Sequence, residues 1–128
     1  MLLRQVVGMI GTNCYILSDD ETREAFVIDP GDDAKKILET VAKNHLYVRY
    51  ILLTHGHFDH VLAVSEIAEK TGAVVCIHEA DAYRLSAGEM AQYQHYMKNK
   101  YREAPNIRKM KDGDSVTLGK VTVQYMHT

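Results

Sequence analysis

The chain has 128 residues, of which 46% are hydrophobic and 25% charged, with a formal net charge of −2. This length predicts one domain over residues 1–128, since about 150 residues per domain is the usual scale. The balanced charge argues against binding to nucleic acid or anionic lipid, and no apolar run approaches the ~18 residues of a membrane span. Two cysteines in apolar runs, with no signal-peptide pattern, predict a cytoplasmic protein with free thiols.

The first part of the chain is predicted to form strands. Short apolar runs separated by turn residues indicate strands at Leu2–Val7, Cys14–Leu17 and Ala25–Ile28. A polar turn at residues 19–22 joins the second of these to the third, which ends at Asp29-Pro30-Gly31.

The period of the apolar residues then changes. Their spacing over residues 34–42 predicts an amphipathic helix, with Asp32 or Asp33 available as its N-cap. Tyr50–Leu53 is a continuous apolar run, which predicts a strand buried on both faces.

Helices and strands continue to alternate along the chain. Residues 61–71 have helical spacing ended by Gly72, and Ala73–Ile77 is another buried strand. Residues 79–102 are predicted to be helical from a weaker pattern. Because strands alternate with helices of 10–14 residues, the fold class is predicted to be a layered α/β sheet. A hairpin turning at Gly119-Lys120 is expected to follow.

The segment Thr54–His60 concentrates side chains that bind metals. Three histidines and an aspartate lie in the pattern H-x-H-x-D-H, directly after a predicted buried strand and before a predicted helix. From composition alone, such a pattern would arise in about one in 700 chains of this length. Imidazole and carboxylate together suit zinc, and iron or manganese less well. The carboxyl end of a strand is also where open α/β sheets bind ligands.

The spacing within this segment divides the candidate ligands into two pairs. Residues two apart in an extended loop point the same way, so His55 and His57 can converge on one ion. Gly56 lets the backbone bend tightly between them. Asp59 and His60 are adjacent and diverge, so they suit a second ion beside the first, or the water that a metal binds.

The H-x-H-x-D-H segment resembles the signature of the metallo-β-lactamase superfamily. Three stretches, Thr12–Tyr15, Val27–Gly31 and Ile51–His55, follow the order seen in its glyoxalase II-like branch. This resemblance implies an αββα sandwich with two metal ions at one edge, most simply zinc. The metal ligands that it implies are His55 and His57 for the first ion, and Asp59 and His60 for the second.

The resemblance also implies a role for Asp29 and an incomplete domain. On spacing alone Asp29 is a turn residue, but a family member would use it to orient the metal loop by hydrogen bonding. Later ligands in the family come from an H-T-P-G-H loop and beyond, and His127-Thr128 resembles the opening of that loop. Residues 1–128 are therefore expected to be the N-terminal part of the sandwich, incomplete at its C-terminus.

The expected function is a metal-dependent hydrolase of thioesters, similar to hydroxyacylglutathione hydrolase, with a small-molecule substrate. A metal-bound hydroxide would attack the carbonyl, and a metal would stabilise the oxyanion. Asp59 would bind metal and orient this nucleophile, which makes it the predicted catalytic residue. A thioester suits such a site because a thiolate, with a thiol pKa of ~8.5, leaves without a strong general acid.

Other interpretations stay open. The same loop with one iron would make the protein a persulfide dioxygenase, which metal analysis and oxygen consumption would distinguish. The chain would instead be a non-catalytic half-domain if it binds metal weakly, and an uncovered sheet face would then favour homo-oligomers. A nuclease is disfavoured by the balanced charge.

His78 is a candidate pocket residue. It follows a predicted buried strand and precedes Glu79-Ala80-Asp81. Helix capping or surface exposure is the competing interpretation of this histidine.

Overall fold

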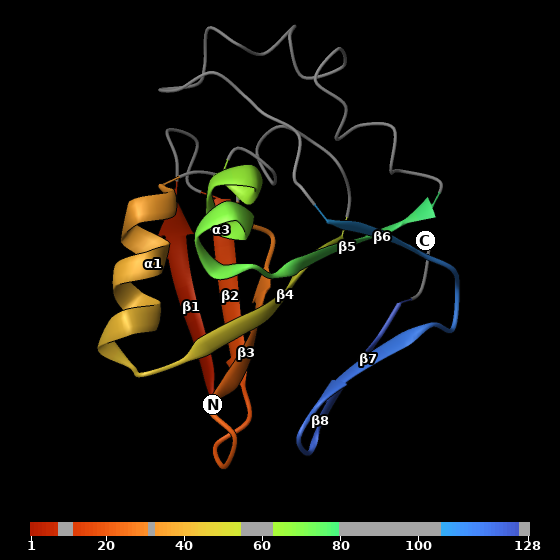
Figure 1. Cartoon of the computed structure of the whole chain (residues 1–128), viewed down its shortest axis with the longest axis horizontal. Coiled ribbons are helices and arrows are strands. Elements are labelled where there is room, and N and C mark those ends of the chain that lie inside the picture. Colours follow the sequence, from red (N-terminus) through yellow and green to blue (C-terminus); the bar gives the residue numbers. More distant parts are fainter. Residues whose placement is uncertain (8–11, 31–32, 55–62, 80–105, 126–128) are drawn as a thin grey trace, which may run out of the picture.

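The computed structural model describes residues 1–7, 12–30, 33–54, 63–79 and 106–125 (Figure 1). Predictions that fall elsewhere, including the start of the second helix and the helical pattern over 80–102, lie outside these residues. The elements are, in chain order, β1 (Leu2–Val7), β2 (Thr12–Ser18), β3 (Glu24–Ile28), α1 (Ala34–Lys43), β4 (Tyr47–Leu53), α3 (Val64–Thr71), β5 (Val74–His78), β6 (Ile107–Met110), β7 (Ser115–Leu118) and β8 (Val121–Gln124).

The larger sheet has the strand order β1-β2-β3-β4-β5-β6, and β7 and β8 pair separately. The pairs β1–β2 and β2–β3 are antiparallel, whereas β3 to β6 run parallel to one another. Parallel neighbours need a crossover connection, and α1 and α3 supply it between β3 and β4 and between β4 and β5. The alternating α/β order predicted from the sequence is confirmed.

Both described helices lie on the same side of the large sheet (Figure 1). The side chains of Ile37 in α1 and Ile67 in α3 are fully buried in one cluster with Ile51 and Leu53 of β4. Burial of each such side chain stabilises the fold by roughly 1.5–3 kcal/mol. Leu52, between the two β4 residues, points to the opposite face, so β4 is buried on both faces as its apolar run predicts.

The β7–β8 hairpin packs on that opposite face. Its side chains Val116 and Leu118, and Tyr125 just after β8, form a cluster with Phe26 and Leu52 of the large sheet. The hairpin and its turn at Gly119-Lys120 agree with the sequence pattern. The sheet face that was expected to be uncovered is therefore covered in part by the hairpin. A homo-oligomer formed through this face stays a prediction.

The helix ends are only partly as predicted. Gly72 ends α3 in the left-handed conformation, and its N–H donates to the Ala68 carbonyl, which confirms the predicted stop. Asp33 occupies the N-cap position of α1 but makes no side-chain capping hydrogen bond. Its φ of 57° departs from the β-region backbone of a capping residue, so the prediction is wrong for Asp33, and the alternative, Asp32, lies outside the described residues.

One strand, β6, has no counterpart in the sequence prediction. It pairs parallel to β5, yet three of its four residues are exposed and only Met110 is buried. An edge strand of this kind carries little apolar signal because one row of its backbone groups and most of its side chains face solvent.

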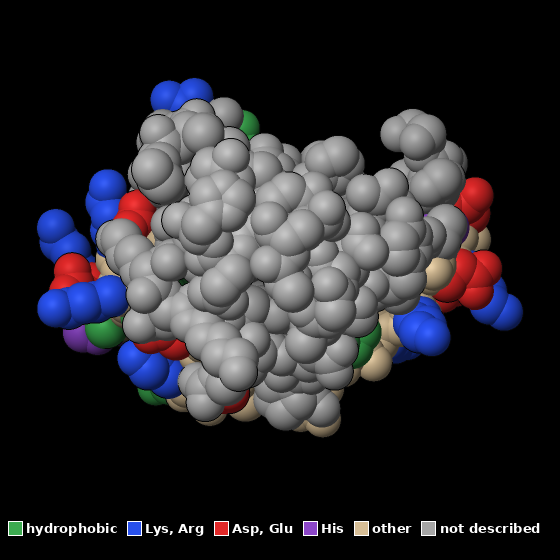
Figure 2. Space-filling view, turned by 90° about the horizontal axis from the view of Figure 1, so that it is seen from above, with side chains coloured by type: hydrophobic (Ala, Val, Ile, Leu, Met, Phe, Trp, Pro, Cys, Tyr) green, Lys and Arg blue, Asp and Glu red, His purple; other side chains and the backbone are tan. Residues whose placement is uncertain are grey.

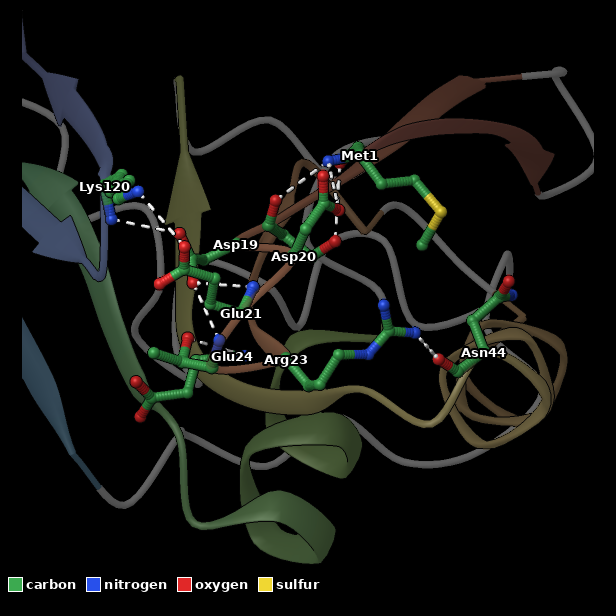
Figure 3. A network of polar contacts seen from close by, with 10 residues as sticks. Met1, Asp19, Asp20, Glu21, Arg23, Glu24, Asn44 and Lys120 are labelled. Carbon is green, nitrogen blue, oxygen red and sulfur yellow. Dashed lines mark hydrogen bonds and ion pairs between the residues drawn. The ribbon is translucent and has the colours of Figure 1, made fainter.

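The carboxylate of Asp19, in the turn between β2 and β3, holds the hairpin turn against the large sheet (Figure 3). Its Oδ1 accepts a hydrogen bond from the Lys120 amide at 3.0 Å, and its Oδ2 accepts from the amides of Thr22 and Glu21 at 2.8 and 3.1 Å. Lys120 Nζ also lies 3.1 Å from Glu21 Oε1. The Asp19 side chain therefore sets where the hairpin meets the sheet.

Substitution of Gly119 with alanine is expected to destabilise this junction. An added Cβ would lie 2.5 Å from Asp19 Cγ, at a φ of +57° that side chains rarely adopt. Overpacking of this kind lowers the free energy of unfolding by about 1–3 kcal/mol, and urea unfolding measures this loss. Gly113→Ala is the matched control, since its φ is +88° but nothing lies within 4 Å of the added Cβ. Equal losses in the two variants would contradict the close approach to Asp19.

The same carboxylate predicts a dependence of stability on acid pH. Hydrogen bonds donated by Lys120 and Thr22 lower the pKa of Asp19 from 3.8 to about 2. A lowered folded-state pKa stabilises the fold above pH 3.8, and this stabilisation is lost as the pH falls through about 2. We expect the difference in unfolding free energy between wild type and Asp19→Asn to shrink over that window. Glu39→Gln, at an exposed residue of α1, is the control, and a constant difference for Asp19→Asn would contradict the assignment.

Candidate metal centre

Asp29 and Thr54 meet at one edge of the large sheet. Because β3 and β4 are parallel and Ile28 pairs with Leu52, the residues that follow them lie side by side. Asp29 Oδ1 accepts a hydrogen bond from the Thr54 amide, and Oδ2 accepts one from Thr54 Oγ1, both at 2.8 Å. The Asp29 amide in turn donates to the Leu52 carbonyl at 2.9 Å. Two side-chain bonds and one backbone bond therefore hold the end of β4 to the end of β3.

This contact lies directly before the metal-ligand motif, because Thr54 is the residue that precedes His55. Asp29 is 7% exposed and has a φ of 53°, a left-handed conformation that aspartate adopts more readily than most residues. The contact is of the kind through which Asp29 would orient the loop. The contact of Thr54 with Asp29 was not predicted from the sequence, since only the pairing of β3 with β4 brings the two residues together.

The four predicted ligands, His55, His57, Asp59 and His60, lie outside the described residues. Within the described residues, no group of three or more His, Cys, Asp or Glu side chains could hold a metal. The ligand assignment therefore stays a prediction. Its donor chemistry, three imidazoles and a carboxylate, fits zinc and accommodates iron or manganese.

His78, the candidate pocket residue, ends β5 at the same edge. It is 9% exposed, which is inconsistent with the surface-exposed alternative. Its Nε2 lies 3.1 Å from Asp112 Oδ1, in the connection between β6 and β7. A role in lining a pocket stays a prediction.

Tyr125 is a buried polar residue that the sequence analysis did not single out. It follows β8, and its hydroxyl lies among backbone groups at the ends of β4 and β5. Burial chiefly raises the pKa of Tyr125, with the neighbouring Cys76 thiol adding to the rise, so the hydroxyl keeps its proton. Its position after an alternating strand was the only signal in the sequence.

Cys14 and Cys76 are free and buried, as expected. Burial raises the pKa of Cys14 to about 12 and that of Cys76 to about 11, so both thiols are protonated at neutral pH. Cys14 lies in the cluster under the helices and Cys76 in the cluster under the hairpin, on opposite faces of the sheet. The two therefore pack as core residues.

Figure 2 views the molecule from above the orientation of Figure 1. Around the rim of this view, basic and acidic side chains of the described residues are intermixed, in keeping with the balanced composition. None of the helices among the described residues has the length and hydropathy that a bilayer-spanning helix needs.

The model of the metallo-beta-lactamase superfamily matches residues 7–128. The chain belongs to this superfamily. The resemblance inferred from the H-x-H-x-D-H segment is thereby confirmed, together with its mixed α/β fold class.

Relatives of this metallo-beta-lactamase superfamily chain include proteins with and without a named activity. An uncharacterised protein of Mycobacterium tuberculosis is 30% identical over an alignment of 129 positions, which covers 94% of this chain and 57% of the relative. Hydroxyacylglutathione hydrolase GloC of Haemophilus influenzae is 36% identical over 63 residues, 49% of this chain and 29% of that protein. The chain thus spans little more than half the length of its first relatives.

Solved structures of the superfamily are similar to the chain as well. The B3 metallo-beta-lactamase BLEG-1 has a TM-score of 0.77 at 28% identity, covering 97% of this chain and 59% of that protein. TTHA1623 in a di-iron-bound form has a TM-score of 0.74 at 28% identity, covering 89% of this chain and 56% of the other. A structural neighbour is therefore iron-bound, and similarity of fold does not distinguish iron from zinc.

Proposed function

We propose that the chain carries the first part of the metal site of a hydrolase that acts on thioesters. The observation that carries the proposal is the contact of the Asp29 carboxylate with Thr54, directly before the H-x-H-x-D-H motif. Membership of the metallo-beta-lactamase superfamily supports the hydrolytic chemistry. The partial match to a hydroxyacylglutathione hydrolase supports the thioester.

The residues of this chain have distinct roles in the proposal. His55 and His57 hold one metal ion, and Asp59 and His60 hold a second, with zinc favoured by the donor set. When bound, such a metal pair supplies a water of lowered pKa and stabilises the negative charge that develops on the substrate oxygen. The Asp59 carboxylate also accepts a hydrogen bond from the attacking water and so aims it at the carbonyl carbon.

The substrate class follows from the leaving group. A thioester releases a thiolate, which with a thiol pKa of ~8.5 needs no strong general acid. Four of the predicted site residues are metal ligands, Asp29 is engaged with Thr54, and His78 Nε2 lies 3.1 Å from Asp112 Oδ1. A substrate whose leaving group needs no proton donor fits this set best.

Metal content and turnover, measured together, test the proposal. The native protein is purified, its metals are quantified by mass spectrometry, and thiol release from a hydroxyacylglutathione thioester is followed before and after chelation. Bound metal with turnover that chelation abolishes would support the proposal. Stoichiometric iron with oxygen consumption on a persulfide, and no thioester cleavage, would overturn it in favour of a dioxygenase.

The same assays on residues 1–128 alone test the half-domain alternative. If the native protein hydrolyses the thioester and residues 1–128 alone do not, these residues are a non-catalytic part of a larger site. Tight stoichiometric zinc and turnover in residues 1–128 alone would exclude that alternative.

A further inference from the structure

The Tyr125 hydroxyl joins the hairpin to the backbone of the large sheet. It accepts a hydrogen bond from the Leu53 amide at 3.1 Å. Its single proton has two acceptors within reach, the Cys76 carbonyl at 2.7 Å and the Leu53 carbonyl at 3.2 Å. The shorter distance favours donation to Cys76, so the hydroxyl bridges β4 and β5.

The bridged residues lie at the edge from which the ligand motif begins. Leu53 is the last residue of β4 and stands two positions before His55. Its pairing with Ile77, next to Cys76, places the hydroxyl between the carboxyl ends of two parallel strands. An anchor here acts on the backbone immediately before the motif.

Tyr125 and Asp29 hold consecutive residues at this edge from different elements. Asp29, after β3, accepts from the amide of Thr54, and Tyr125, after β8, accepts from the amide of Leu53. The two backbone amides that precede His55 are thus both bound by side chains. Because each anchor comes from a distant part of the chain, tertiary contacts hold the backbone at the end of β4.

The hairpin gives the hydroxyl a fixed position. The Tyr125 amide donates to the Asp114 carbonyl and the Tyr125 carbonyl accepts from the Gly113 amide, both at 2.8 Å. The far end of the hairpin is held by the Lys120 amide on Asp19. The ring packs in the cluster of Phe26 and Leu52, so ring and hydroxyl have separable functions.

We propose that Tyr125 is a positioning residue for the metal-ligand segment, in which its hydroxyl fixes the end of β4, the backbone from which the segment with His55 and His57 begins. The inference rests on the proposed metal site but not on its substrate. Tyr125 acts through Leu53 and touches neither substrate nor metal in this assignment.

Tyr125→Phe in the native protein tests this inference, because it removes the hydroxyl and keeps the ring. We expect the dissociation constant for zinc, measured by competition with a chromogenic chelator, to rise about tenfold. The thermal shift that zinc produces in the variant should be smaller than in wild type. The reason is that two backbone groups at the end of β4 lose their partner and the ligand segment loses its fixed starting point.

Val116→Ala is the matched control. Val116 belongs to the same buried cluster, but its aliphatic side chain has no atom that could form a hydrogen bond with the backbone at the end of β4. It is expected to lower the melting temperature of the metal-free and zinc-bound forms alike and to leave zinc affinity unchanged. If Tyr125→Phe behaves as Val116→Ala does, the hydroxyl has only a structural role and the proposal is overturned.

Hydrogen exchange of the metal-free wild type gives a reading that needs no variant. Slow exchange of the Leu53 and Thr54 amides is expected, since both donate to buried side-chain oxygens. Fast exchange at Leu53 would overturn the inference. Tight zinc binding without thioester cleavage would defeat the proposed substrate but leave the Tyr125 test intact, whereas absence of zinc binding in the wild type would defeat both.

Discussion

Replacement of Asp59 with alanine is expected to lower thioester turnover by about a hundredfold or more. Positioned proton acceptors contribute about 10²- to 10⁴-fold to rate, and Asp59 is proposed both to hold metal and to aim the attacking water. The measurement is kcat for hydroxyacylglutathione hydrolysis by the native protein and the variant, each with its metal content determined. The loss should appear in kcat even where metal is supplied in excess.

Asp59→Asn and Asp20→Ala sharpen this test. The asparagine variant keeps the shape of the side chain but removes its charge, and it should lose activity nearly as far as the alanine variant. Asp20 has an exposed side chain in the β2–β3 turn, and its replacement should leave kcat unchanged. Near-wild-type turnover in Asp59→Ala would remove Asp59 from the catalytic role.

Asp29→Asn is expected to weaken zinc binding by about 10- to 100-fold, the range found when residues that orient metal ligands are changed. The amide has one acceptor oxygen where the carboxylate has two, so one of the bonds to Thr54 is lost. Asparagine tolerates the φ of 53° at this position, so backbone strain does not account for the effect. Competition with a chelator measures the change.

Thr54 offers a matched pair of variants for the same contact. Thr54→Ser keeps a hydroxyl that can donate to Asp29 and should bind zinc nearly as wild type does. Thr54→Val keeps the branched shape and removes the donor, and it should fall between wild type and Asp29→Asn. Equal zinc affinity in the serine and valine variants would contradict a role for the hydroxyl in the Asp29 contact.

The Asp29 and Tyr125 contacts together indicate how the site is connected to the fold. Three parts of the chain far apart in sequence converge where β4 ends: Asp29 after β3, Cys76 on β5, and Tyr125 after β8. The ligand motif is contained in one short segment. The residues directly before it are bound by side chains that lie 25 and 72 positions away in the sequence. Loss of the Tyr125 hydroxyl is therefore expected to affect the proposed metal site, whereas loss of apolar packing in the hairpin is expected to affect stability alone.

Features set by local spacing could be predicted from the sequence alone. Such features depend on neighbours within a few positions in the sequence. They include the apolar periodicity of α1, the glycine that ends α3, the apolar run of β4 and the two-residue turn at Gly119-Lys120. The H-x-H-x-D-H motif is of the same kind, because donor type and spacing within one segment suffice to predict metal chemistry. Family membership followed from that motif and its flanking stretches.

Tertiary structure alone decided the contacts that link distant segments. Four features depend on which strands become neighbours in the sheet. They are the contact of Asp29 with Thr54, the packing of the hairpin on the sheet, the edge strand β6 and the hydrogen bonds of the Tyr125 hydroxyl. No periodicity in the sequence encodes these partners, since a polar residue after a strand looks the same whether it faces water or another strand's backbone. The sequence determines which chemical groups the protein contains, and the pairing of strands in the folded protein determines which of these groups come into contact.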